Sequence, residues 1–527
     1  MIMKNILLLL FLMVSLNAAS QNDNYTIKKI NKTIRLINTQ YVDTVNMPHL
    51  VEVAVKAMIN ELDPHSKYLT KEQLKKNNEA LNGSFAGVGI HYQILNDTLL
   101  ILSTTEGGPS EKAGLKAGDK VVKIDGTSAV GKSITNSFFS RKLRGTKGSA
   151  VQLEIRRRDV DSILTFTVTR GSIPIPTVDA AFMLDRHIGY VKINGFSFTT
   201  HKEFKTVTAQ LKSEGMKSLI LDLRGNPGGL MMASIRIADE FLEESQLIVY
   251  TEGEHYKRQD YKSTKSGSLK NEKLIILVDE FSASASEILA GAIQDLDRGI
   301  IAGRRSYGKG LVGRNYTLPD GSAVRLTTGH YYTPTGRCIQ KPYSGDNSEY
   351  KKDLQTRLNN GEYLHADSIH FPDSLKYKTP KGRTVYGGGG IMPDVFYPMD
   401  TVTFPDYYNK LFTRGIINAY AGQYFDSHLN DLFIKYPDVR SFEKEFRVTD
   451  DILLQISVFA KEKYGLEKDS LSYQRYGERI ARYFKAYLGR DLYEHGAYYL
   501  LISHSDPMIM KSVQLLNVKK SFRIIER

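Results

Sequence analysis

The chain has 527 residues, of which 41% are hydrophobic and 24% charged, and its net charge is +13. This composition excludes a disordered or collagen-like protein, and the length suggests three or four globular domains. The positive charge is spread along the chain, and the longest basic run, residues 156–158, is followed by Asp159 and Asp161. We therefore expect no nucleic-acid partner, because phosphate binding requires concentrated positive charge.

The first twenty residues have the layout of a secretory signal peptide. Lys4 precedes an apolar run at residues 6–16, and small residues follow at 18–20. This run is too short for a membrane-spanning helix, which needs about 20 apolar residues. No later segment is long enough either, so we expect no integral membrane span. Because Cys338 is the only cysteine, no internal disulfide can form. We predict an exported protein from which residues 1–20 are removed.

Residues 21–80 are predicted to be helical. Two series of apolar residues recur at steps of three and four, which indicates an apolar face on each helix. The first series is Ile27, Ile30, Ile34, Ile37 and Tyr41, and the second is Val51, Val55, Met58, Ile59 and Leu62. Two interpretations remain open: the faces pack on the body of the same chain, or they form a homodimer contact.

The pattern changes twice along the rest of the chain. Over residues 81–172, short β-branched stretches alternate with glycine-rich turns, which predicts a small β-rich domain. Over residues 173–400, apolar strands alternate with helices, which predicts an α/β core. Residues 401–527 are rich in tyrosine and helical in pattern, and the Ser-Asp-Pro sequence at 505–507 predicts the start of the last helix.

The sequence Ser-Ala-Ser-Ala-Ser-Glu at residues 282–287 lies between an apolar strand and a helix. Ser284 and Glu287 have the S-x-x-E spacing of a capping box, and capping by itself explains this serine. The alternative is a nucleophilic hydroxyl held at a helix N-terminus, where free N–H groups stabilise a developing oxyanion.

Lys309 favours the second interpretation. It lies between Gly308 and Gly310, one helix and one strand after Ser284, so both residues can reach the same end of the sheet. A lysine held against a glycine-rich backbone loses hydration, which favours the neutral amine. A neutral amine beside a serine is a competent general base. The alternative is a solvated loop lysine.

The same lysine fits part of a phosphate-binding loop. Gly303, Gly308 and Lys309 match the spacing of that motif. The motif continues with a Ser or Thr that holds magnesium, whereas this chain has Gly310. We therefore disfavour nucleotide binding.

A glycine-rich turn follows another apolar strand in the sequence Leu-Asp-Leu-Arg-Gly-Asn-Pro-Gly-Gly at residues 221–229. One interpretation is a tight connection between a strand and a helix. The other is an anion site, in which the N–H of Gly228 or Gly229 is an oxyanion donor beside the N–H of Ala285.

Three blocks resemble the tail-specific, C-terminal processing peptidases, which are serine proteases with a Ser-Lys centre. They are residues 221–229, 282–295 and 303–312. Residues 87–90 and 107–126 are similar to a PDZ domain, which this family inserts before its protease core. Further similar stretches are residues 62–69, 331–337 and 387–394, so that the resemblance spans residues 25–395.

The resemblance implies an α/β protease core with an inserted β-rich PDZ domain, N-terminal helices and a C-terminal helical region. It implies that Ser284 is the nucleophile and Lys309 the general base. It assigns the oxyanion to the N–H of Ala285 and to a glycine of the 225–229 turn. The implied substrates are proteins or peptides with free C-termini, and the implied location is the periplasm.

The PDZ resemblance also implies a binding site for the substrate tail. The backbone N–H groups of Gly87, Val88, Gly89 and Ile90 would receive a chain-terminal carboxylate while the substrate adds to the sheet as a strand.

One position departs from the family pattern. Relatives carry a glutamine four residues after the lysine, where it orients the base, and this chain has Gly313. The departure implies slower turnover, replacement by another group, or a catalytically impaired relative that only binds peptide tails.

We expect no metal and no organic cofactor. The sequence contains neither an H-E-x-x-H motif nor a Cys/His ligand cluster, and no G-x-S-x-G elbow anchors a Ser-His-Asp triad.

Overall fold

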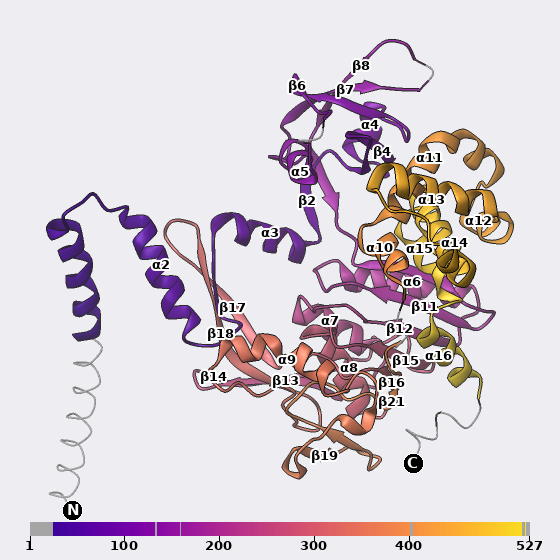
Figure 1. Ribbon diagram of the computed structural model, residues 1–527. Helices are drawn as coiled ribbons and strands as arrows, with labels where there is room; N and C mark the ends of the chain where they lie inside the picture. The colour runs from indigo at the N-terminus through magenta and orange to yellow at the C-terminus, as the bar shows by residue number, and fades with distance from the viewer. Residues whose placement is uncertain (1–24, 132–133, 159, 401–403, 519–521, 523–527) are drawn as a thin grey trace, which may run out of the picture. The chain divides into compact units, whose positions relative to one another are not determined.

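The computed structural model describes residues 25–131, 134–158, 160–400, 404–518 and 522 (Figure 1). The predicted signal peptide lies outside these ranges. The chain divides into two compact units, Met1–Thr70 with Asn315–Leu326 and Lys71–Arg314 with Thr327–Arg527. Within the described ranges, no helix combines the length and the apolar character needed to cross a membrane.

The smaller unit contains helical residues 25–40, α2 (Met47–Asn60) and β1 (Lys67–Leu69). The side chain of Asn46 begins α2 by accepting a hydrogen bond from His49 N–H. β1 pairs antiparallel with the start of β18 (Ala323–Tyr332).

Most residues of the two predicted apolar series are exposed in this unit, although Ile59 is buried. Ile27, Tyr41 and Met58 are each more than half exposed. Exposed apolar residues that follow one another on adjacent helices are typical of interaction surfaces.

An antiparallel sheet forms the β-rich domain in the larger unit. Its strands are β3 (Ile90–Leu95), β4 (Thr98–Thr104), β5 (Lys120–Ile124), β6 (Thr127–Ser128), β7 (Ala150–Arg156) and β8 (Leu164–Thr169). β3 lies at one edge of the sheet order β3-β4-β5-β7-β8. A separate pair, β2 (Ser84–Gly87) with β9 (Gly171–Pro174), joins the two ends of the domain. The helices are α3 (Lys71–Asn82), α4 (Pro109–Ala113) and α5 (Asn136–Leu143).

The α/β core is built on a second sheet with the order β10-β11-β12-β15-β16-β21. The strands are β10 (Val178–Met183), β11 (Ile188–Ile193), β12 (Ser218–Asp222), β15 (Lys273–Val278), β16 (Ile300–Gly303) and β21 (Val395–Phe396). β10 is antiparallel to its neighbour, and the other pairs are parallel. Every residue of β11, β12 and β16 is buried, as expected for central parallel strands.

Helices cover both faces of the core sheet (Figure 1). α6 (Thr200–Ser213), α7 (Met231–Asp239) and α8 (Ala285–Asp295) contribute to the apolar cluster on one face. α16 (Pro507–Asn517) packs on the other face. Since parallel strands end at the same edge of a sheet, the turns after β12, β15 and β16 meet there.

The core also carries smaller elements. They are β13 (Leu247–Gly253), β14 (Tyr256–Lys262), β17 (Leu311–Thr317), α9 (Asn347–Asn359), β19 (Lys376–Lys378), β20 (Thr384–Tyr386) and the 3₁₀ turns Ala366–Ser368 and Asp373–Leu375. β13 pairs with β14 and with the end of β18.

The C-terminal region is helical. Its helices before α16 are α10 (Asp406–Thr413), α11 (Ile416–Lys435), α12 (Val439–Glu445), α13 (Asp450–Tyr464), α14 (Ser470–Tyr493) and α15 (His495–Ser503). At the start of α16, Asp506 Oδ1 accepts hydrogen bonds from the N–H groups of Met508 and Ile509, which confirms the predicted cap.

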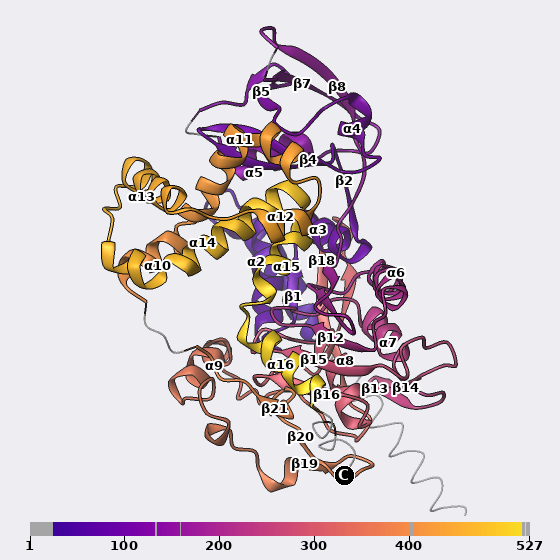
Figure 2. The same ribbon diagram turned by 90° about the vertical axis from the view of Figure 1, so that its right-hand side faces the viewer.

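The aromatic core of this region continues onto the β-rich domain. Leu95, Leu100 and Leu102 of β3 and β4 belong to the same buried cluster as Tyr420 and Phe484. α11 contacts β3 and α14 contacts β4. Figure 2 shows α11 beside the β-rich domain. The predicted fold class, an α/β core with an inserted β-rich domain and helical regions at both ends, is confirmed.

Candidate active site

Ser284 lies in the turn between β15 and α8, where it precedes the first residue of the helix. Its backbone is left-handed in φ (+56°), which is rare for a residue with a side chain and stores strain. The side chain is half-buried, whereas α8 is buried along its whole length. A strained, partly accessible serine at a helix N-terminus suits a nucleophile as well as a cap.

Glu287 connects this turn to the segment of Lys309. Its Oε2 accepts hydrogen bonds from the N–H of Ser284 (2.7 Å) and the N–H of Lys309 (2.9 Å). Its Oε1 accepts from the N–H of Gly308 (2.7 Å) and from Ser306 Oγ (2.6 Å). Because one oxygen accepts from both residues, the backbone nitrogens of Ser284 and Lys309 lie within two hydrogen-bond lengths of each other.

The carboxyl of Glu287 is 1% exposed. Burial raises its pKa, and the four hydrogen bonds partly offset this effect because they stabilise the ionised form. A buried carboxylate with four donors fixes the positions of the groups that donate to it.

Tyr331 joins the same two residues from β18. Its hydroxyl lies 3.1 Å from Ser284 O and 2.7 Å from Lys309 O, so the phenol lies between the two carbonyl oxygens. Burial raises the pKa of Tyr331 far above its usual value, and the hydroxyl therefore remains a donor. The structure thus holds the backbones of Ser284 and Lys309 together from two sides.

The glycine-rich turn after β12 lies directly against Ser284. Gly228 has a φ of +101°, and a Cβ there would be 2.7 Å from Ala283 O and 2.8 Å from Ser284 Cβ. Only glycine therefore fits at this position. Asn226 connects the turns, because its carbonyl accepts from Ala283 N–H (3.0 Å).

The two predicted glycine donors differ. The N–H of Gly228 already donates to Asn226 Oδ1 (2.9 Å). The N–H groups of Gly229 and Ala285 have no acceptor among the residues that the structure describes. The geometry therefore favours Gly229 over Gly228 as the partner of Ala285.

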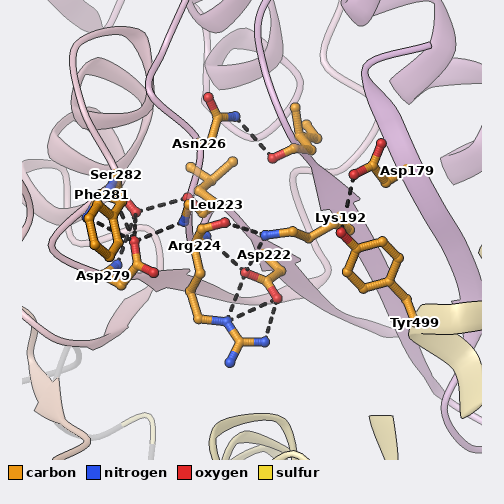
Figure 3. A network of polar contacts seen from close by, with 12 residues as sticks. Asp179, Lys192, Asp222, Leu223, Arg224, Asn226, Asp279, Phe281, Ser282 and Tyr499 are labelled. Carbon is orange, nitrogen blue, oxygen red and sulfur yellow. Dashed lines mark hydrogen bonds and ion pairs between the residues drawn. The ribbon is translucent and has the colours of Figure 1, made fainter. Parts of the chain in front are cut away.

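A buried charge network anchors the beginning of this turn (Figure 3). Arg224 pairs with Asp222 (Nη2–Oδ2, 2.6 Å) and with Asp506 (Nη1–Oδ2, 2.9 Å), and Lys192 donates to Asp222 and to the carbonyl of Arg224. Burial alone would raise the pKa of Asp222, but Arg224 and Lys192 hold it well below its usual range. Asp222 and Arg224 thus hold the turn in place, and Asp506 ties the C-terminal region to it.

In the β-rich domain, the predicted carboxylate loop, residues 87–90, runs from the end of β2 to the start of β3. Gly89 has a φ of +76°. The carbonyl groups of Val88 and Gly89 accept hydrogen bonds from Ser110 N–H (3.0 Å) and Thr105 N–H (3.1 Å). For the N–H groups of Val88 and Gly89 there is no acceptor in the described part of the chain. The fold thus fixes this loop by its carbonyl groups and leaves two neighbouring donors unused.

Gly313 lies exposed on β17. A different glutamine is bonded to the lysine loop: Gln340 Oε1 accepts from Gly310 N–H (2.9 Å), and its Nε2 donates to Lys341 O and Tyr350 Oη. Gln340 therefore holds the backbone next to Lys309.

The roles of three residues are not evident from the sequence. The sequence predicts only a capping role for Glu287 and no role for Tyr331 or Gln340. The S-x-x-E spacing was a signal for Glu287, and Tyr331 lies in one of the family-like stretches, but neither pattern indicates contact with Lys309. Among the described residues, no group of three or more His, Cys, Asp or Glu side chains has the arrangement of a metal site.

Comparison with known proteins identifies the class of protein to which this chain belongs. Residues 187–347 match the profile of peptidase family S41, and residues 101–157 match that of a PDZ domain. Residues 13–73 match the N-terminal domain of the activating protease CtpB, and residues 407–494 match a family of unknown function. The protein is a serine-type peptidase.

Curated relatives define the family. The carboxy-terminal processing protease CtpB of Bacillus subtilis is 32% identical over 368 residues, which cover 67% of this chain and 76% of the relative. CtpA of the same organism is 35% identical over 343 residues, covering 65% and 72%. The carboxy-terminal-processing protease of Bartonella bacilliformis is 35% identical over 325 residues, covering 61% and 74%. The chain belongs to the tail-specific, carboxy-terminal processing proteases, as the sequence motifs predicted.

Proposed function

We propose that this protein is an exported endopeptidase that binds protein substrates by their C-terminal residues and cleaves peptide bonds with Ser284 and Lys309. The observation that carries the proposal is the bridge made by Glu287, whose Oε2 accepts hydrogen bonds from the backbones of both residues. Tyr331 lies between the same two backbones. A Ser-Lys pair requires this proximity.

In the proposed reaction, Ser284 Oγ attacks the carbonyl carbon of the scissile peptide bond while its proton passes to the neutral Lys309 Nζ. The lysine returns this proton to the leaving amine as the C–N bond breaks, and an acyl-enzyme remains. Water then attacks the ester and gives a proton to Lys309. As the bond between the acyl carbon and Ser284 Oγ breaks, Lys309 returns this proton to Ser284 Oγ, so that both residues are restored and the new C-terminus leaves. The scheme requires neither a metal nor an organic cofactor.

The tetrahedral intermediate carries a negative oxygen. Ala285 N–H and Gly229 N–H are the proposed donors, since Gly228 N–H already donates to Asn226. Losing one oxyanion donor typically costs about 100-fold to 1,000-fold in rate.

Substrate tails are proposed to bind at residues 87–90. The unused N–H groups of Val88 and Gly89 would receive the terminal carboxylate, and the tail would pair with the free edge of β3. The proposed partners are therefore proteins or peptides with free C-termini.

Two further proposals concern the intact protein. The signal-peptide layout at residues 1–20 supports export, with the periplasm as the destination. The exposed apolar residues on the N-terminal helices support a homodimer through these helices.

The test is mass spectrometry of a tailed protein incubated with the wild type and with the Ser284→Ala and Lys309→Ala variants. We expect each variant to lose at least about 1,000-fold in cleavage rate, with a nearly unchanged melting temperature. Ser266→Ala and Lys257→Ala are matched controls, because both residues are exposed and lie outside the site. Cleavage by the Ser284→Ala protein at the wild-type rate would disprove the proposal.

Gly313 supports a second candidate function, a pseudoprotease that binds tails without cutting them. If this candidate is correct, Gly313→Gln cleaves the tailed protein and the wild type does not. Labelling of wild-type Ser284 by a fluorophosphonate probe would count against it.

A further inference from the structure

A hollow of about 330 Å³ lies where the PDZ domain meets the C-terminal helices. His91 and Gln93 of β3 line it on one side. Arg490 and Asp491 of α14, Glu494 and His495 line it on the other side. We call this site the β3 hollow. It is separate from the turns around Ser284, and it adjoins the edge strand to which a substrate tail would pair.

Two side chains that line the β3 hollow, those of Asp491 and Gln93, each carry a buried acceptor atom with no donor in the described part of the chain. Asp491 is 3% exposed, and its Oδ1 accepts hydrogen bonds from Arg490 Nε (3.0 Å) and Nη2 (2.7 Å). Its Oδ2 is buried and has no hydrogen-bond partner among the described residues. The same is true of Gln93 Oε1, although Gln93 Nε2 donates to Asn418 O (3.3 Å). Buried acceptors are normally satisfied, so the complementary ligand is a hydrogen-bond donor.

The charged side chains around the hollow determine whether a neutral or a cationic hydrogen-bond donor fits it better. Asp491 and Glu494 contribute two carboxylates, and Arg490 contributes one cation that is already paired with Asp491 and Asn418. Burial lowers the pKa of His495, which favours its neutral form. Glu494 is held at a φ of +70°, a costly conformation for a residue with a side chain. The surplus of negative charge favours a cationic donor.

The alternation of β3 determines which part of a tail reaches the hollow. Ile90, Tyr92 and Ile94 pack toward the apolar core of the PDZ domain. His91 and Gln93, between them, have their side chains on the other face of the strand, and the hollow is lined by both of them and also by Tyr92 and Ile94. A peptide that pairs with β3 has the same alternation, because successive side chains of a strand point to opposite faces. With the terminal carboxylate at residues 87–90 and the last side chain facing the PDZ core, the next-to-last side chain faces the β3 hollow.

We propose that the C-terminal helices complete the tail-binding groove and select substrates with lysine or arginine at the next-to-last position. A cationic side chain there would donate to Asp491 Oδ2 and Gln93 Oε1 and would face Glu494. This inference rests on the proposed recognition of substrate tails at residues 87–90. It assigns substrate selection to a region that the PDZ and protease motifs do not include.

The test measures binding of fluorescein-labelled peptides to the full-length Ser284→Ala protein by fluorescence anisotropy. Three peptides differ only at the next-to-last residue, which is Lys, Ala or Glu, and each is made with a free and with an amidated C-terminus. We expect the free Lys peptide to bind about tenfold tighter than the Ala peptide, and the Glu peptide to bind weakest.

The same peptides are then measured on Asp491→Asn and Glu494→Gln, each combined with Ser284→Ala. We expect the preference for Lys over Ala to fall below threefold in both variants, while the Ala peptide keeps its affinity. Glu494 is exposed, so its variant keeps the test valid if Asp491→Asn fails to fold. Glu478→Gln, an exposed change elsewhere on α14, is the matched control and should keep the preference.

Each outcome is decisive. Equal binding of the three free peptides, or a Lys preference that survives in both variants, overturns the inference and leaves tail recognition intact. If amidated peptides bind as tightly as free ones, the proposed recognition of the terminal carboxylate is wrong, and the inference falls with it.

Discussion

Glu287 and Asp491 are both buried carboxylates, but their surroundings differ. Glu287 accepts hydrogen bonds through both oxygens, from four donors that belong to the turns around Ser284 and Lys309. Asp491 accepts through one oxygen from Arg490, and its other oxygen has no partner in the described part of the chain. Burial raises the pKa of both groups.

The difference separates a structural role from a binding role. A carboxylate whose oxygens are both satisfied holds its donors in place, so Glu287 fixes the geometry of the candidate active site. A carboxylate with one unsatisfied oxygen in a hollow has a free energy that a cationic ligand can lower. A buried carboxylate thus holds the candidate active site together in one place, and in the β3 hollow a second one is available to bind a ligand.

Glu287→Gln is expected to have the largest effect on stability. The amide nitrogen must replace either Oε1 or Oε2, and in both positions it faces two donors. We expect the free energy of unfolding of the core to fall by about 3–5 kcal/mol, with loss of peptidase activity. Denaturant unfolding and hydrogen exchange of residues 282–310 measure these effects, and the exposed Glu252→Gln is the control. Unchanged protection of these residues would show that Glu287 does not hold the turn.

Asp491→Asn tests the second carboxylate through the pH dependence of protein stability. Burial raises the pKa of Asp491 to about 6, so between about pH 4 and pH 6 the folded state binds a proton that the unfolded chain releases. Wild-type stability therefore falls as the pH rises through this window, by up to about 3 kcal/mol from this group. The asparagine variant has no ionisable group at this position and therefore does not lose stability in this way.

We therefore expect the denaturation midpoint of Asp491→Asn to rise relative to that of the wild type as the pH is raised from 4 to 7. The asparagine Oδ1 can still accept from Arg490, which keeps the comparison close to one ionisation. A difference between the two proteins that stays constant over this range would contradict the assignment.

Gly89→Ala has the smallest expected effect and tests the carboxylate loop. At a φ of +76°, the new Cβ is strained and lies 2.9 Å from Ile173 Cδ1. We expect peptides with a free C-terminus to bind about tenfold more weakly, because the loop donors shift, while amidated peptides change little. Gly126→Ala is a matched control: its φ is +71° with open space around it, and it lies in another turn of the PDZ domain. Equal losses in both variants would attribute the effect to strain alone.

Much of the fold could be predicted from the sequence. The helical periodicity of residues 21–80, the β-branched stretches of the PDZ domain and the apolar strands of the core are local patterns, and the structure contains the corresponding elements. The cap at residues 505–507 is equally local, since Asp506 bonds the next residues of its own helix. The family motifs added the order of the domains.

The candidate site was predicted only in part. Ser284 and Lys309 were recognisable because their glycine- and serine-rich surroundings are motifs. Glu287, Tyr331 and Gln340 were not recognised, because their partners lie about 20 to 50 residues away along the chain and no spacing rule connects them. The choice between Gly228 and Gly229 likewise depended on a hydrogen bond to Asn226.

The sequence by itself determined the helices, the strands, the glycines of the turns and the family, because these follow from local conformational preferences and contiguous motifs. Only the tertiary structure decided which carboxylate holds Ser284 beside Lys309 and which one lines a hollow against β3. Burial and hydrogen-bond satisfaction depend on packing between distant segments, and a carboxylate has the same sequence letter whether both of its oxygens are bonded or one is not.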